Sequence, residues 1–160
     1  TGHRPNKLGC YSSQVFNRLV DLCISELQTI NPQSVISGFA LGFDMALAQA
    51  AINLKIPLLA YVPFEGQEKM WPKQSQLYYK ELLSKAEKVR VCCNGGYSTD
   101  SMQRRNICMV DDANFLLALF DSTPGGTANC IMYAESEIHG GRMDLVIKNV
   151  WNRWEKMEQS

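Results

Sequence analysis

The sequence predicts a three-layer α/β domain with a mostly parallel sheet. Strand-like and helix-like segments alternate along the whole chain, without a break in composition or an internal repeat, as expected when helices cover both faces of a parallel sheet. Glycine turns recur after strands, or where a first strand should stand. The length of 160 residues suits one domain, 1–160, whose residues 151–160 form a C-terminal tail.

The bulk composition disfavours several classes of protein. Hydrophobic residues make up 46% and charged residues 20% of the chain, as in a soluble globular protein. No apolar run approaches the roughly 20 residues of a membrane span, and no signal-peptide pattern is present. We therefore expect a cytoplasmic protein with no membrane partner. Acidic and basic residues balance at 16 each, so nucleic acid is not the expected general partner.

Metal and disulfide chemistry are not expected. The six cysteines contain no Cys-x-x-Cys arrangement, and His3 and His139 are isolated, so we predict no metal site and no cofactor. The cysteines are interpreted as reduced thiols, mostly small core residues. The chain starts at Thr1 in a turn, where we expect either that a leading strand has been removed or that the first strand is minimal.

The first half of the chain alternates helix, strand, helix and strand. Residues 12–29 carry apolar side chains at three- and four-residue spacing, with Ser12 or Ser13 as N-cap and Asn31-Pro32 as the end. A short strand at 34–37 leads through a glycine turn into an alanine-rich helix, 45–54. The next buried strand is expected at residues 56–62.

The second half begins with a long connection. Residues 63–73 form an irregular loop, longer than a minimal connector and therefore more often functional. A helix at 74–85 and a strand at 88–93 follow. A turn at 94–96 then leads into a helix at 101–111.

The most informative stretch lies near the C-terminal end. Residues 115–120 are apolar without alternation, as in a strand buried on both faces. A glycine pair follows, and Thr127 is expected to cap a helix to about residue 138. The last strand is expected at 145–150. In the tail, Trp151 and Trp154 are expected to pack back onto the body.

The glycine turns should meet at one edge, because ligands of parallel sheets bind at the carboxyl ends of the strands. Glycines and helix N-termini favour a phosphate, and an arginine adds a bidentate charged donor. The candidate ligand-binding residues in this crevice are Gly2, His3, Arg4, Ser37, Gly38, Gly42, Asp44, Gly125, Gly126 and Thr127, joined by Trp71 and Arg105.

Several of these residues have two interpretations. Asp44 either accepts a ribose hydroxyl or caps its own helix, and His3 either contacts phosphate or sits in a polar turn. Trp71 either stacks on a base or anchors its loop by packing. Arg104 and Arg105 either serve the site or form a solvated basic pair.

Five motifs in order resemble the YpsA/YoqJ-type branch of the SLOG superfamily. They are Thr-Gly-His-Arg-Pro at 1–5, Ser-Gly-x-Ala-x-Gly-x-Asp at 37–44, Tyr-x-Pro with a downstream Trp at 61–71, Arg-Asn-x-x-Met-Val-Asp at 105–111 and Gly-Gly-Thr-Ala at 125–128. The resemblance covers about residues 1–150. It implies a Rossmann-like fold and kinship with phosphoribohydrolases, with the DNA-processing protein DprA and with sensor domains for nucleotide-derived signals.

The resemblance also bears on catalysis. In the phosphoribohydrolase branch an Arg-x-x-x-Met motif and a Pro-Gly-Gly-x-Gly-Thr-x-x-Glu motif supply the active arginine and glutamate. Arg105 fits the first motif, whereas Cys130 stands where the second has its glutamate. Hydrolysis of an N-glycosidic bond needs a carboxylate to activate water. The catalytic candidates are therefore Arg105 with Glu65 or Glu68 on the long loop.

The leading hypothesis is binding of a nucleotide or nucleotide-derived small molecule, as a sensor or sequestering protein, possibly in phage or bacterial conflict. The alternative is an enzyme, a nucleoside 5′-monophosphate phosphoribohydrolase. A third interpretation is DprA-like binding of single-stranded DNA, which the neutral charge disfavours. Related proteins are often homodimers or larger, so we also expect a homo-oligomer.

Overall fold

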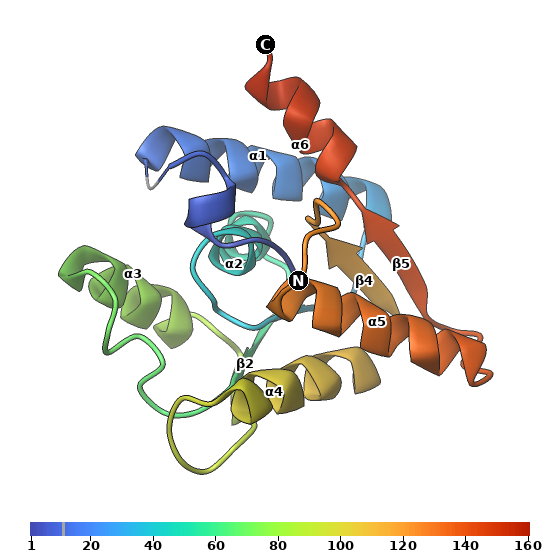
Figure 1. Cartoon of the computed structure of the whole chain (residues 1–160). Coiled ribbons are helices and arrows are strands. Elements are labelled where there is room, and N and C mark those ends of the chain that lie inside the picture. The colour runs from blue at the N-terminus through green and yellow to red at the C-terminus, as the bar shows by residue number, and fades with distance from the viewer. Residues whose placement is uncertain (11) are drawn as a thin grey trace.

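The computed structural model describes residues 1–10 and 12–160 (Figure 1). In the described part of the chain, no helix is both long and apolar enough to span a membrane. The elements follow in the order η1 (Pro5–Lys7), α1 (Ser13–Ile30), β1 (Val35–Ser37), α2 (Phe43–Asn53), β2 (Leu58–Val62), α3 (Lys73–Ser84), β3 (Lys88–Val91), α4 (Thr99–Asp111), β4 (Phe115–Ala118), α5 (Gly126–His139), β5 (Val146–Asn149) and α6 (Trp151–Glu158).

All of the strand pairs are parallel. One group has the order β1-β2-β3, and β4 pairs with β5. Gly2 adds a parallel bridge to Leu119, and the amino group of Thr1 donates to the carbonyl of Leu117 at 2.9 Å. The first residues of the chain therefore run alongside the end of β4.

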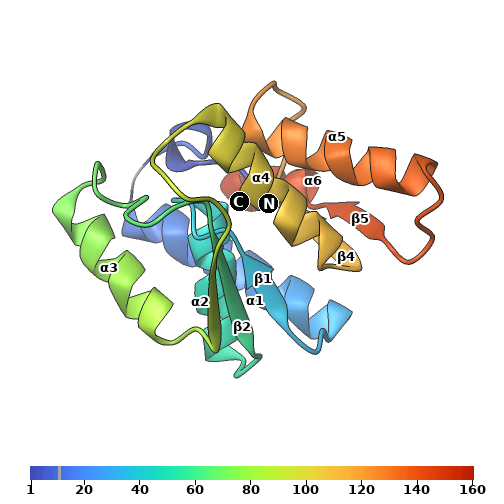
Figure 2. The same ribbon diagram turned by 90° about the horizontal axis from the view of Figure 1, so that it is seen from below.

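Helices cover both faces of the strands. Figures 1 and 2 show α4 and α5 together on one side, with α1, α2 and α3 on the other; α6 packs against α1. The side chains of β4 alternate between two cores, since Leu117 joins the core under α1 and α2 while Leu116 joins the core under α4 and α5. The predicted three-layer Rossmann-like α/β fold is confirmed.

The ends of several elements differ from the prediction. β4 stops at Ala118, two residues early, because Leu119 pairs only with the short N-terminal segment. Helix α2 begins at Phe43, earlier than predicted. The predicted Thr127 cap is wrong: Gly125 is the N-cap of α5, so Thr127 lies inside the first turn.

The C-terminal tail packs onto the body as expected, and most of the cysteines lie in or against a core. The tail forms helix α6, in which Trp154 is buried while Trp151 is half-buried, so both tryptophans pack onto the body. All six cysteines are free. Of these, Cys23 and Cys130 are buried and Cys92 and Cys108 pack against the core under α4 and α5, whereas Cys10 is exposed and Cys93 is half-buried.

Candidate functional site

A cavity of about 420 Å³, here called the cradle, opens where the N-terminal segment, α4 and the start of α5 meet. The turn after β1 closes its floor. The described residues that line it include Gly2, His3, Arg4, Lys7, Ala40, Asp44, Tyr97, Met102, Gln103, Arg105, Asn106, Thr123, Gly125, Gly126 and Thr127. The cradle therefore lies at the carboxyl ends of β1 and β4, where ligands of such sheets bind.

The floor of the cradle holds a buried guanidinium beside a buried carboxylate. Arg105 Nη1 donates to the carbonyl oxygen of Gly38 at 2.7 Å and lies 4.0 Å from Asp44 Oδ2, with both side chains 7% exposed. A Cβ on Gly38 would stand 2.5 Å from that Nη1 and 2.8 Å from the same Oδ2. Glycine is therefore required here so that both charged groups can reach the end of β1.

The Asp44 carboxylate accepts no hydrogen bond from any residue that the structure describes, although Ser37 Oγ donates to its backbone carbonyl at 2.7 Å. The N-cap of α2 is Gly42, which has no side chain to bond the helix end, so Asp44 lies in the first turn and not at the cap. Buried carboxylates are normally paired. Asp44 thus presents an acceptor to whatever enters the cradle.

The start of α5 forms a second wall. Its N-cap Gly125 makes no side-chain hydrogen bond, so the first N–H groups of the helix have no capping partner. An added Cβ on Gly125 or Gly126 would meet no atom within 4 Å. Asn106 Nδ2 donates to the carbonyl of Gly126 at 3.2 Å and fixes this turn to α4. The glycine pair therefore leaves open space in front of a helix N-terminus.

The N-terminal segment supplies the third wall. Arg4 is exposed, and Lys7 Nζ donates to Thr123 Oγ1. His3, 4% exposed, lies with Nε2 2.6 Å from Asp121 Oδ1. Burial lowers the pKa of His3 below 6.5 despite the neighbouring carboxylate. Hydrogen bonds from Thr123, and then the contact with His3, lower the pKa of Asp121 to about 2. At neutral pH the positive charge of this wall comes from Arg4 and Lys7.

The structure brings eight of the predicted ligand-binding residues to the cradle: Gly2, His3, Arg4, Asp44, Arg105, Gly125, Gly126 and Thr127. Ser37 and Gly38 lie beneath it and bond Asp44 and Arg105. Gly42 and Trp71 do not line it. A Cβ on Gly42 would stand 2.6 Å from the carbonyl oxygen of His3, and Trp71 packs edge-on against Tyr79 at 5.4 Å.

The proposed catalytic glutamates lie elsewhere. Glu65 is exposed, Glu68 is 8% exposed, and neither lines the cradle. Cys130, at the position where the resemblance places the phosphoribohydrolase glutamate, is fully buried in the core under α4 and α5. Among the described residues lining the cradle, the one carboxylate is Asp44.

Sequence reasoning missed several lining residues. Asn106 stands beside Arg105 in the recognised motif and could have been inferred from it. Tyr97, 73% exposed, reaches the cradle from the loop before α4 and touches Phe64 edge-on. Lys7 follows the N-terminal motif by two residues. For Tyr97 the sequence offered no signal, because a turn with one aromatic residue is common in surface loops.

The fold and the position of the cradle define a Rossmann-like α/β protein with a polar cavity at its strand ends. Comparison with protein families agrees: the model of the YspA SLOG family matches residues 1–146. The chain belongs to the YspA SLOG family.

Proteins of several bacilli are similar to this chain. The uncharacterised SPbeta prophage-derived protein YoqJ of Bacillus subtilis (strain 168) is 30% identical over 129 residues, covering 71% of this chain and 75% of YoqJ. A UPF0398 protein of Bacillus cereus is 24% identical and covers 82% and 78%. One from Bacillus anthracis (strain A0248) is 22% identical and covers 97% of both chains.

A solved structure has the same fold. DNA processing protein A (DprA) from Streptococcus pneumoniae superposes with a TM-score of 0.58 at 19% identity. The match covers 79% of this chain but 44% of the DprA chain, so the present chain spans less than half of that protein. At this identity the likeness establishes the common fold alone.

Proposed function

We propose that the protein binds a nucleotide or nucleotide-derived small molecule in the cradle, as a sensor or a sequestering protein. The observation that carries the proposal is that the uncapped, unobstructed N-terminus of α5 opens into the same cavity as Arg105. Free N–H groups and a helix dipole favour an anion, and arginine forms paired hydrogen bonds with phosphate.

Each wall has a part in this proposal. The turn at Gly125 and Gly126 takes the phosphate, with Arg4 and Arg105 balancing its charge. The Asp44 carboxylate accepts from the hydroxyls of a ribose, which satisfies its open acceptor sites. Tyr97 offers a ring on which a base stacks, in place of the predicted Trp71.

Calorimetry with mono-, di- and cyclic nucleotides and ADP-ribose derivatives tests the proposal. The decisive variant is Gly126→Ala, because its methyl group enters open space in front of the helix N-terminus. We expect normal folding and affinity lowered about 10-fold or more, the effect of losing roughly 1.4 kcal/mol of charged hydrogen bonding.

Gly96→Ala is the matched control, since a Cβ there also meets no atom within 4 Å and Gly96 does not line the cradle. This variant should bind like the original chain. Absence of binding by every ligand of the panel, or equal affinities of the two variants, would refute the phosphate site.

Hydrolysis of a nucleoside 5′-monophosphate is the second candidate function, and one observation favours it. Asp44 places a carboxylate with open acceptor sites in the cradle, 4.0 Å from Arg105, so it offers a base for water in a chain where Cys130 stands at the position of the phosphoribohydrolase glutamate. Chromatography of the free base decides between the two functions. Release that Asp44→Asn abolishes supports hydrolysis, whereas a nucleotide recovered intact after binding rules it out.

A further inference from the structure

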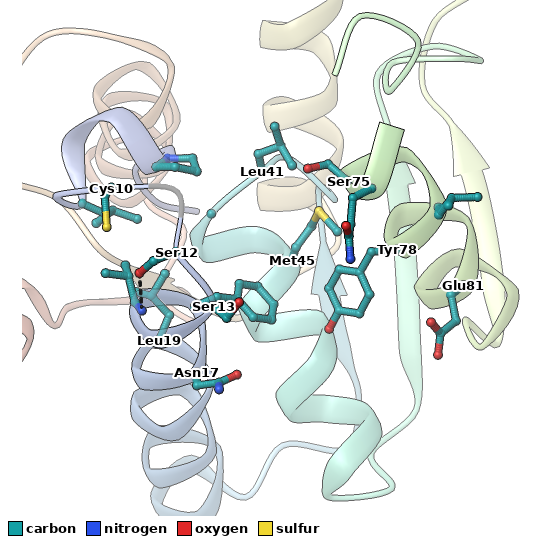
Figure 3. A pocket seen from close by; sticks show the side chains of 17 residues that line it. Cys10, Ser12, Ser13, Asn17, Leu19, Leu41, Met45, Ser75, Tyr78 and Glu81 are labelled. Atoms are coloured by element: carbon teal, nitrogen blue, oxygen red, sulfur yellow. Dashed lines mark hydrogen bonds between the residues drawn. The ribbon is translucent and has the colours of Figure 1, made fainter. Parts of the chain in front are cut away.

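A second cavity of about 530 Å³ lies between α1, α2 and α3, and we call it the helix cavity (Figure 3). Its walls are mainly apolar, with Leu8, Phe16, Leu19, Leu41, Met45 and Tyr78 among them. Of the described lining residues the one charged group is Glu81, an exposed side chain that is paired with Lys85 at 2.8 Å. Size and lining are those of a small-molecule site for an uncharged group.

The turn after β1 separates this cavity from the cradle. Ala40 lines the cradle, whereas the next residues, Leu41 and Gly42, line the helix cavity. Gly42 has φ +94°, and a Cβ there would stand 2.6 Å from the carbonyl oxygen of His3. The backbone of His3 therefore lies directly against the turn at Gly42, and the two cavities share a thin wall.

A shallower hollow of about 220 Å³ passes over that wall. It is lined by Arg4 and Asn6, which also line the cradle, and by Pro5, Cys10 and Leu41, which also line the helix cavity. The cradle, the hollow and the helix cavity therefore border one another across η1. Arg4 stands at the boundary, because it lines both the cradle and the hollow.

We propose that a single ligand occupies both cavities: a nucleotide whose phosphate is esterified to an uncharged, apolar group, which lies in the helix cavity. This inference rests on the proposed binding of a nucleotide in the cradle. A phosphate beside Arg4 lies at the boundary, which is where the two halves of a phosphodiester diverge. The nucleoside half turns towards Asp44 and Tyr97, and the second half passes over Pro5 and Leu41.

The walls select the chemistry of the second group. With no cation among the described lining residues, an anionic second group would lose its hydration without a partner, and the one carboxylate, Glu81, is already paired with Lys85. Phe16 and Tyr78 meet edge-on at 5.6 Å, and Met45 adds a polarisable thioether beside them. Aromatic edges and thioethers favour a ring system. The ligand class is thus a nucleotide phosphodiester with an apolar ring as its second ester group.

Calorimetry with four probe pairs tests the inference, each pair being a ribonucleoside 5′-monophosphate and its 1-naphthyl phosphate ester. We expect at least one ester to bind about 10-fold or more tightly than its parent nucleotide. Ser75 lines the helix cavity from α3, so Ser75→Trp should remove this gain and leave affinity for the parent nucleotide unchanged. Ser84→Trp, an exposed position on the same helix outside the cavity, should keep the gain.

A second measurement does not depend on a variant. In protein labelled at the methionine methyl groups, the Met45 resonance should shift with the ester and not with the parent nucleotide, because Met45 lines the helix cavity. The resonance of Met102, which lines the cradle, should shift with both. Parent binding without a gain for the ester, or a gain that survives Ser75→Trp, overturns the extended ligand alone. Failure of both probes of every pair overturns the nucleotide site itself.

Discussion

At the scale of single residues, Gly38 leaves the space that Arg105 and Asp44 occupy at the floor of the cradle. Its missing side chain allows Arg105 Nη1 to bond its carbonyl at 2.7 Å and to lie 4.0 Å from Asp44 Oδ2. The end of β1 thereby brings a cation and an anion together in a place from which water is largely excluded. The charge that a ligand meets is therefore set by one position without a side chain.

Gly38→Ala should move the guanidinium without unfolding the protein. The added methyl group would meet the flexible tip of Arg105 at 2.5 Å, which moves more readily than backbone. We expect phosphate affinity to fall about 10-fold or more and the melting temperature to fall by about 2–4 °C, as one buried hydrogen bond of roughly 1 kcal/mol is lost.

Calorimetry and thermal melts check this pair of effects, with Gly96→Ala as the control. A Gly38→Ala protein that melts as the original and binds with unchanged affinity would show that Arg105 does not contact the ligand.

At the scale of elements, Glu26 links its own helix, α1, to β5 and α6. It is fully buried and accepts from Lys148 of β5 and Arg153 of α6. Burial alone raises the pKa of Glu26, but the hydrogen bonds and charges of Lys148 and Arg153 outweigh it, so the pKa lies below its ordinary value of 4.5. The last strand and the tail helix are thus tied to α1 by one carboxylate.

Glu26→Gln should destabilise the protein by about 1–3 kcal/mol at pH 7. Breaking a fully buried ion pair would cost more, but Lys148 and Arg153 are 40% and 47% exposed. The stabilisation by Glu26 is present above its unfolded pKa and is lost as the pH falls through the lower folded pKa. The difference in melting temperature between the two proteins should therefore shrink below about pH 4.

Thermal melts from pH 7 to pH 3 measure that difference. Glu135→Gln, an exposed position on α5, is the control and should change little at any pH. A difference that stays constant with pH would mean that Glu26 acts through packing and not through its charge.

Most of the elements between α1 and β5 were predictable, because apolar spacing, apolar runs and the turns between them marked the helices and strands. The ends of the helices and strands were harder to predict. Thr127 has a hydroxyl that could cap a helix, yet Gly125 is the N-cap of α5 because its φ of +148° suits the turn. At the cradle, the positions of Gly2, Gly125 and Gly126 were predictable because turns after parallel strands meet at one edge of the sheet, whereas Arg105 was inferred from the resemblance. Tyr97 was not found and Trp71 was expected in the crevice, since the paths of their loops depend on packing against Phe64 and Tyr79.

At the scale of the whole molecule, the two cores are joined through β4. Leu117 packs on one side and Leu116 on the other, so neither core is complete without this strand. That 1–160 is a single domain remains a prediction, and so does the homo-oligomer, for which the exposed residues Val89 and Val91 of strand β3 offer a surface.

A single domain should lose both cores in one urea transition. Tryptophan fluorescence reports the core under α1, because Trp71, Trp151 and Trp154 all pack against it. Hydrogen exchange of α5 reports the other core. We expect equal midpoints from the two probes, and opening of α5 at lower urea would instead indicate two independently folding halves.

The turn of residues 40–42 contributes to both cavities, so each cavity can change without the other. Ala40 lines the cradle while Leu41 and Gly42 line the helix cavity, so adjacent residues of one turn contribute to two different cavities. Under the proposed binding, a change at Leu41 would alter which apolar group fits the helix cavity and leave the proposed phosphate site unchanged. Under the proposed binding, the chemistry of the second ester group can therefore change at residue 41 while the fold and the phosphate site stay the same.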